Sequence, residues 1–161
     1  MRALLMIVLA LGLTGLAGCS PNKEGGNYTD VKDDDAAMNA AIAKAKATSA
    51  EFVTAFHAQK PGTKDFFVKK PYPTPKGSQE HMWIEVREEH DGALKGVIAN
   101  EAEETREVKM GDGVTLNISE ISDWKYQDGK KLMGGYTIRY FVDRMSPKER
   151  EEFLKENGFE L

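Results

Sequence analysis

The sequence predicts an α+β domain: a long N-terminal helix packed on a curled, mostly antiparallel sheet or small, partly open barrel, with a short C-terminal helix. Two observations carry this prediction. Between residues 36 and 59 the apolar residues recur every three or four positions, as on one face of a helix. Beyond Gly62 the apolar period becomes two, and Asp-Gly pairs punctuate the segment, as in hairpin-connected strands.

The N-terminal stretch has the composition of an export signal. Met1-Arg2 gives a positive start, an apolar run follows, and Cys19 is the single cysteine of the chain. The run is short for a membrane span, which needs about 20 apolar residues. Leu16-Ala17-Gly18-Cys19 resembles a bacterial lipobox, so we expect residues 1–18 to be a lipoprotein signal peptide and Cys19 to carry acyl chains, palmitate among them. A plain signal peptide or an uncleaved anchor helix are the alternatives.

Residues 19–32 are polar and contain Pro21 and the pair Gly25-Gly26, which favours a flexible tether between the lipid and one α+β domain over residues 33–161. Ser20 follows the cysteine where an inner-membrane retention signal would have Asp. We therefore expect attachment to the outer membrane, facing the periplasm. The formal net charge of −4, with both signs interspersed, excludes the electrostatic footprint of a nucleic-acid-binding protein.

The acidic triplet Asp33-Asp34-Asp35 precedes the amphipathic segment. Its position indicates an N-cap with acids in the first turn, although a calcium site or a phosphate mimic is an alternative. Pro61-Gly62 ends the helix. The polar face of this helix is not strongly basic, so packing against a sheet is favoured over binding to a membrane surface.

Period-two patterning predicts the strands. They are expected over residues 65–73, 80–90, 93–100, 114–118, 121–126 and 131–142, with prolines stopping the first. Ser146 and Glu149 then form a capping box for a final helix over residues 146–157, with Pro147 at its first position and Gly158 at its stop.

The tetrapeptide Glu80-His81-Met82-Trp83 carries the densest chemistry of the chain. If Met82 faces the core, His81 and Trp83 share the opposite face, about 7 Å apart along the strand. Such a pair suits ligand stacking and hydrogen bonding, or a general base. The alternative is structural: Trp83 packs beneath the N-terminal helix and His81 is an ordinary strand residue.

Asp123 and Arg139 are the other polar candidates. Asp123, in Ile121–Trp124, could orient an imidazole, or it could cap its own backbone in an Asx turn. Arg139 could clamp a carboxylate of a ligand, or it could pair with Asp123 or Glu80.

Several enzyme signatures are missing from the sequence. It contains no G-x-S-x-G, no H-E-x-x-H and no Gly-rich phosphate loop. His57, His81 and His90 lack metal-ligand spacing, so no metal and no cofactor are predicted. His57 near a helix end and His90 near a turn are typical of solvated histidines.

The chain resembles the domain-of-unknown-function 2314 family, which includes small bacterial lipoproteins. The segments that carry the resemblance are AIAKAKATSAEFVTAF, EHMWIEV, GVIAN, VKMGDGVTLNISEISDW and GGYTIRY. Together they cover about residues 33–140 and leave the final helix outside the pattern. The resemblance implies a fold unit and no established activity, and its motif positions are Glu80, His81, Trp83, Asn100, Gly111, Asp112, Asp123, Trp124, Gly135 and Arg139.

These features favour a non-catalytic periplasmic binding module. We expect the surface of His81, Trp83, Trp124 and Arg139 to hold a peptide, glycan or protein partner. Glu80, Asn100 and Asp123 are the other candidate binding residues. One alternative is a hydrolase that uses His81 as base, oriented by Asp123 or Glu80. The other is an inhibitor or immunity lipoprotein, for which KKPYPTPKGSQ is the candidate loop.

Overall fold

The computed structural model describes residues 35–161. The signal peptide, Cys19 and the tether expected over residues 19–32 lie outside this range. The elements in chain order are α1 (Ala36–Ala47), α2 (Ser49–Ala58), β1 (Thr63–Pro73), β2 (Gln79–His90), β3 (Ala93–Ile98), β4 (Gly113–Asn117), the 3-10 helix η1 (Ile118–Glu120), β5 (Asp123–Asp128), β6 (Lys131–Gly134), α3 (Tyr136–Val142) and α4 (Pro147–Asn157).

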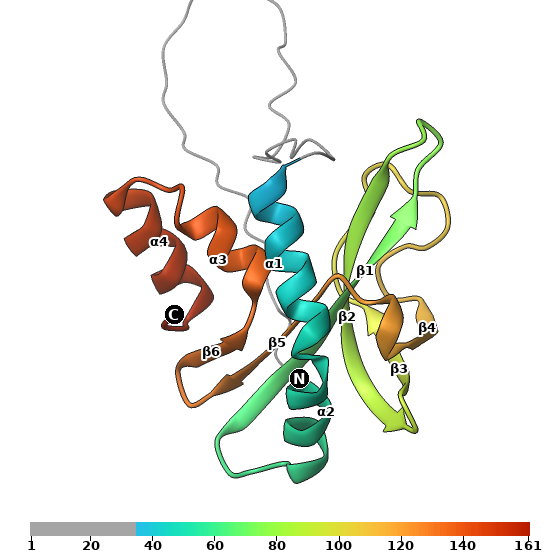
Figure 1. The fold of residues 1–161 in the computed structure, drawn as a ribbon, viewed down its shortest axis with the longest axis horizontal. Coiled ribbons are helices and arrows are strands. Elements are labelled where there is room, and N and C mark those ends of the chain that lie inside the picture. Colours follow the sequence, from blue (N-terminus) through green and yellow to red (C-terminus); the bar gives the residue numbers. More distant parts are fainter. Residues whose placement is uncertain (1–34) are drawn as a thin grey trace, which may run out of the picture. The chain divides into compact units, whose positions relative to one another are not determined.

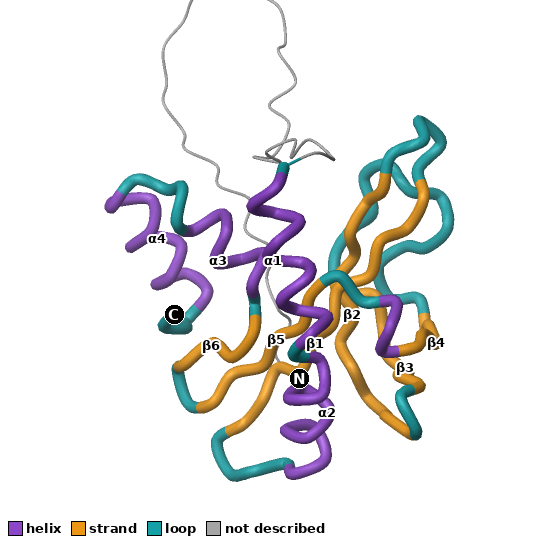
Figure 2. The backbone as a smooth tube through the Cα atoms, viewed as in Figure 1, coloured by secondary structure: helices purple, strands orange, loops and turns teal. Residues whose placement is uncertain are grey.

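The six strands form one open, antiparallel sheet in the order β4-β3-β2-β1-β5-β6. Helices α1 and α2 lie along one face of this sheet, and α3 and α4 lie beside β6 (Figures 1 and 2). The α+β class is therefore confirmed. The sheet does not close, so the barrel alternative is not formed.

The single long N-terminal helix is instead two helices that meet at Thr48. Thr48 has φ −104° and ψ 8°, outside the helical range, and its Oγ1 donates to the carbonyl of Lys44 at 2.9 Å. A β-branched hydroxyl residue that bonds back to the preceding turn disfavours continuation of a helix. The break brings Thr48 Oγ1 within 3.2 Å of the indole Nε1 of Trp124. The N-cap is confirmed at Asp35, whose Oδ1 accepts from Ala37 and Met38. The acids expected in the first turn are not present in α1, and Asp33 and Asp34 lie outside the described residues.

The core lies between α1/α2 and the sheet. Phe52 of α2 is fully buried, and its ring lies 5.8 Å from Phe66 of β1 and 6.0 Å from Trp124 of β5. Met82 and Ile84 of β2, both 0 % exposed, belong to the same cluster. The predicted division of β2 into a core face and an outer face is thus confirmed.

The predicted strand over residues 131–142 is wrong beyond Gly134. Gly134 and Gly135 have φ of 67° and 63°, a left-handed conformation that strands do not use and that glycine adopts readily. The chain turns there, and residues 136–142 form α3. A Cβ at Gly134 would lie 2.3 Å from the carbonyl oxygen of Trp124, so this turn requires glycine for space as well.

The first strand ends at Pro73 as predicted and begins two residues earlier than expected, at Thr63. Its pairing with β5 ends at Lys69, so that edge needs no donors from Pro71 and Pro73. The hairpin prediction at Asp91-Gly92 is confirmed: both residues have positive φ, 51° and 79°, as a type I′ turn requires.

The C-terminal tail adds to the edge of the sheet. Helix α4 has the predicted capping box of Ser146 and Glu149, with Gly158 at its C-cap. After it, the backbone N–H of Leu132 donates to the carbonyl of Glu160, and the N–H of Glu160 donates to Lys130, each at 2.7 Å. The tail thereby covers part of the outer edge of β6.

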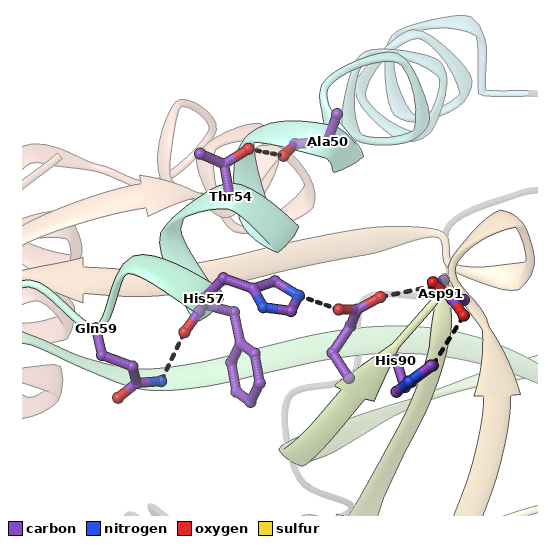
Figure 3. A network of polar contacts seen from close by, with 9 residues as sticks. Ala50, Thr54, His57, Gln59, His90 and Asp91 are labelled. Atoms are coloured by element: carbon purple, nitrogen blue, oxygen red, sulfur yellow. Dashed lines mark hydrogen bonds and ion pairs between the residues drawn. The ribbon is translucent and has the colours of Figure 1, made fainter.

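A polar contact ties α2 to the β2–β3 hairpin. His57 reaches the carboxylate of Glu89 (Figure 3), whose side chain is only 3 % exposed. Glu89 also accepts from the N–H of Gly92 at 2.7 Å, and this bond is the main cause that lowers the pKa of the Glu89 carboxyl. His57 is 57 % exposed, as expected of a solvated histidine, and it also forms half of a link between helix and sheet. His90 beside it is exposed and pairs with Asp91.

Candidate functional site

Several family-motif residues hold the backbone rather than face solvent. The Glu80 carboxylate accepts the N–H groups of Glu103, Glu104 and Thr105 at 2.7–2.9 Å. These three bonds lower the pKa of Glu80 against the opposing effect of burial. Glu80 thus fixes the loop between β3 and β4.

Asn100 continues the sheet where β3 ends. Its Oδ1 accepts the N–H of Trp83 at 2.7 Å, and the next ladder bond runs from Ala99 N–H to the Trp83 carbonyl at 2.8 Å. Gly111, with φ 90°, and Asp112, which accepts from the N–H of Lys109, form the turn that closes the same loop.

Asp123 caps the short helix α3 and is completely buried. Its carboxylate accepts the N–H of Trp124, Tyr136 and Thr137 and the hydroxyl of Thr137, at distances of 2.6–3.1 Å. Four donors occupy this carboxylate. Asp123 therefore caps backbone N–H groups, as the second of the two predictions for it stated. It caps the N–H of its neighbour Trp124 and also the first N–H groups of α3, which starts thirteen residues later.

Trp124 and Arg139 also lie away from the expected surface. Trp124 is 1 % exposed, beneath α1, and its indole donates to the carbonyl of Ala45 at 3.0 Å. Arg139 lies in α3 and turns back onto β6, where it donates to the carbonyls of Gly134 and Leu132. Arg139 therefore pairs with neither Asp123 nor Glu80.

His81 contacts Ser122, the residue just before β5. Its Nδ1 lies 2.7 Å from Ser122 Oγ, and Ser122 is held by its N–H to the carbonyl of Lys69 at 2.7 Å. Because Glu80 and Asp123 are engaged by backbone donors, the two carboxylates expected to orient His81 face other groups.

Trp83 lies on the face of the sheet opposite α1 and α2, with a lysine from each of two other strands. Lys69 Nζ lies 4.5 Å from the centroid of the indole ring and Lys125 Nζ lies 5.0 Å from it. Lys125 Nζ is also 4.9 Å from the ring of Phe67. We call Phe67, Lys69, His81, Trp83 and Lys125 the Trp83 face.

The strand register explains this grouping. Lys69 of β1 pairs with Trp83 of β2 on one side and with Asp123 of β5 on the other, and Phe67 pairs with Lys125. Residues two apart on a strand share a face, so the outer face collects these side chains while Phe66 and Val68 enter the core. The register therefore assembles two cations around one half-buried indole.

The ammonium groups on this face are poorly solvated. Burial lowers the pKa of Lys69 to about 8, the Asp123 carboxylate partly opposes that change, and the charge of Lys125 adds to it. Burial likewise lowers the pKa of Lys125, against the attraction of Asp65 and Asp123. Lys69 donates to Thr137 Oγ1 at 2.9 Å. Neither lysine takes part in an ion pair among the described residues.

Sequence reasoning identified His81 and Trp83 but missed Lys69 and Lys125. Lys125 is flanked by Trp124 and Tyr126 in the sequence, which was a weak signal, whereas Lys69 follows Val68 and precedes Lys70 and gave none. Their meeting depends on the pairing of β1 with β2 and β5, which one sequence does not specify.

Other features of the described residues offer less. Between α2 and β5 lies a hollow of about 380 Å³ that is lined by Glu51, Tyr126 and Asp128 among others. No cluster of three or more metal-ligating side chains occurs within residues 35–161. In the same range no helix is both long and apolar enough to cross a bilayer.

The geometry defines a small α+β domain with a cationic and aromatic sheet face opposite α1 and α2. The chain belongs to the family described as "Uncharacterized protein conserved in bacteria (DUF2314)", whose model matches residues 35–161. The resemblance seen in the sequence motifs is thus confirmed, and the match extends through α4, beyond the segments that first indicated it.

Two curated relatives are similar to parts or all of the chain. "Uncharacterized protein YegJ" of Escherichia coli (strain K12) is 31 % identical over 152 residues, covering 94 % of each chain. "Putative ankyrin repeat protein NMB1133/NMB1171" of Neisseria meningitidis serogroup B (strain ATCC BAA-335 / MC58) is 34 % identical over 73 residues, covering 45 % of this chain and 29 % of that protein. No solved structure matches the chain.

Proposed function

We propose that this chain is a lipid-anchored, non-catalytic binding module of the bacterial cell envelope, which holds a peptide, glycan or protein partner on the Trp83 face. The observation that carries the proposal is the placement of Trp83 itself. It is a half-buried indole on the sheet face that α1 and α2 leave uncovered, with two ammonium groups against its ring. Aromatic side chains flanked by polar groups are typical of binding surfaces.

The other motif residues support this assignment by contrast. Glu80, Asn100, Asp123, Trp124 and Arg139 are all engaged by the backbone or the core. Fold maintenance therefore accounts for those five, whereas Trp83 and the lysines make no comparable contribution to the core. The proposed surface is accordingly narrower than the one predicted from the sequence.

A photo-crosslinking experiment in cells tests the binding face. A photo-crosslinking phenylalanine analogue replaces Glu85, which is opposite Phe67 in the sheet and 40 % exposed at its side chain. The matched control carries the analogue at Lys148 of α4, which is 86 % exposed. We expect an adduct from position 85 that is missing from position 148 and is lost with Trp83→Ala. Identical adducts from both positions, or adducts indifferent to Trp83→Ala, would refute the proposed face.

Of the two alternatives, the hydrolase has less support in the site, and the inhibitor or immunity protein is supported only by a projecting hairpin. A hydrolase that uses His81 needs an orienting carboxylate, and the Glu80 and Asp123 carboxylates are occupied by backbone donors. An inhibitor or immunity protein needs a protruding loop. Residues 69–79 mostly form the end of the β1–β2 hairpin, which extends beyond the rest of the sheet (Figure 1).

Cys19 is the proposed site of the lipid anchor. We further propose that the lipid attaches the chain to the outer membrane, facing the periplasm. The support is the lipobox-like Leu16-Ala17-Gly18-Cys19 sequence, and several acyl chains suffice for stable membrane binding at about 0.8 kcal/mol per buried CH₂. Cys19→Ser should release the chain from membranes and abolish labelling by a palmitate analogue. Unchanged labelling would contradict the assignment.

A further inference from the structure

The two lysines on the Trp83 face carry more positive charge than the surrounding residues neutralise. The Asp123 carboxylate attracts the charged Lys69 side chain, but four hydrogen-bond donors already occupy it. Lys125 is attracted by Asp65 and Asp123, while Asp65 lies 3.5 Å from Lys64. The ammonium groups of Lys69 and Lys125 therefore lie close to the ring of Trp83, and nearby carboxylates compensate their positive charge only in part.

The hydrogen-bonding capacity of this pair is also unfilled. An ammonium group has three N–H donors, and Lys69 uses one on Thr137 Oγ1. Lysine acts as a point charge without the planar fork of arginine, and it is a common ligand for phosphate. The pair therefore suits a compact oxyanion with several acceptor oxygens better than a planar, bidentate group.

Charge matching selects among such anions. A carboxylate carries one negative charge and would leave one ammonium uncompensated. A phosphate monoester carries about −1.5 to −2 at pH 7, which balances two ammonium groups.

We propose that Lys69 and Lys125 form an anion site on the Trp83 face that binds a phosphate monoester group of the partner between their two ammonium groups, with the indole of Trp83 as its floor. This inference rests on the proposed function and narrows its partner to one that bears a phosphate monoester, either soluble or carried by a lipid. The site needs no metal, because both positive charges come from side chains.

The site has an expected pH profile. The phosphate dianion predominates above a pKa of about 6, and Lys69 loses its proton through a pKa of about 8. On the Trp83 face, the groups around Lys69 are His81 and Trp83 of β2, Asp123 and Lys125 of β5, and Thr137 of α3. Affinity should therefore be greatest between these two values and fall as Lys69 becomes neutral. Lys69→Arg, whose guanidinium stays charged, should remove the fall on the alkaline side.

The test is an indole ¹⁵N–¹H NMR titration of the full lipidated chain in nanodiscs of zwitterionic lipid, with inorganic phosphate as the probe. The chain has two tryptophans. The indole signal of Trp83 detects binding at the site. The indole of Trp124 donates a hydrogen bond to the Ala45 carbonyl in the core, so its signal detects changes in the fold. We expect phosphate to shift the Trp83 signal to saturation at roughly millimolar concentration and to leave the Trp124 signal in place. A second arm uses nanodiscs containing phosphatidic acid and no added phosphate.

Matched variants separate the site from general ionic effects. Lys69→Gln and Lys125→Gln should each weaken the response about tenfold or more, whereas Lys64→Gln, on the same strand as Lys69 and 61 % exposed, should not. A shift in either arm supports the site, and the arm that responds identifies a soluble or a lipid-borne source. The inference is overturned if Trp83 responds in neither arm, if chloride at equal ionic strength gives the same shift, or if both glutamine variants bind as wild type. Partner adducts from position 85 without a phosphate response would leave the proposed function standing and this inference refuted.

Discussion

Replacing Lys69 by methionine should stabilise the protein at neutral pH. The pKa of Lys69 is lowered from 10.5 to about 8, so the charged form is disfavoured in the folded state by about 3 kcal/mol relative to the neutral amine. Methionine keeps the apolar stem against Trp83 but loses the hydrogen bond to Thr137 Oγ1, which is worth about 1 kcal/mol. The difference predicts a gain of about 2 kcal/mol in the free energy of unfolding at pH 7.

The sign of this effect depends on pH. Below pH 8 Lys69 is charged in both the folded and the unfolded chain, and the full cost of its burial is present. Between pH 8 and 10.5 the unfolded chain binds more protons than the folded one, so wild type gains stability as pH rises. The advantage of Lys69→Met should therefore shrink across this window and reverse by about 1 kcal/mol, the value of the Thr137 bond, near its upper end.

Guanidinium unfolding of both chains in the same detergent, at several values between pH 6.5 and 10, measures the difference directly. The titration of Lys125 occurs in both proteins and largely cancels. A Lys69→Met variant that is less stable than wild type at pH 7, or a difference that stays constant across the series, would refute the reasoning. A gain in stability combined with a lost phosphate response would identify Lys69 as a residue retained for binding at a cost to the fold, as is common at functional sites.

Three further substitutions test the roles assigned within the fold. Asp123→Asn replaces one of the accepting oxygens with an NH₂ group that faces other donors, and it should lower the free energy of unfolding by about 2–4 kcal/mol. A loss below about 0.5 kcal/mol would contradict the capping role. Gly96→Ala places a Cβ 2.3 Å from the carbonyl oxygen of Glu85 and should cost about 1–3 kcal/mol, while Gly113→Ala, with open space around it, should be nearly neutral by thermal melting. Glu80→Gln should speed hydrogen exchange of the amides at 103–105 while leaving the core amides protected, and equal exchange in both chains would argue against the clamp.

Much of the fold follows from the sequence because burial is one-sided. Met82, Ile84 and Val86 alternate with polar residues, and one face of the sheet is covered, so their register is fixed by the hydrophobic pattern. The same reasoning gave the Asp91-Gly92 hairpin, in which both residues need positive φ. At β2 and the Asp91-Gly92 turn, the alternation of apolar residues and the positive φ required at the turn predict the same hairpin, and the structure contains it.

The error at residues 136–142 shows where local pattern is insufficient. Tyr136, Ile138 and Tyr140 alternate as in a strand, while Tyr136 and Tyr140 are also one helical turn apart. The choice falls to the helix because Asp123, far back in the sequence, supplies the acceptors for its first N–H groups. Because that partner comes from tertiary structure, the alternation alone favoured the wrong element.

The candidate site was predictable in the same partial way. His81 and Trp83 are neighbours on one strand, so their shared face followed from the alternation of strand residues. Lys69 and Lys125 reach Trp83 from two other strands, and their positions depend on strand order. The aromatic half of the site could therefore be predicted from the sequence, and its charged half required the sheet.

With the proposed lipid anchor, the pairing of Glu160 with the edge of β6 affects how copies of the chain would meet on a membrane. Chains tethered to one surface meet one another far more often than chains free in solution, and an open strand edge under such crowding invites β-addition between copies. The last residues of the chain act as a built-in shield for that edge. An affinity tag appended after Leu161 should weaken this pairing and favour strand addition between copies at the exposed edge of β6.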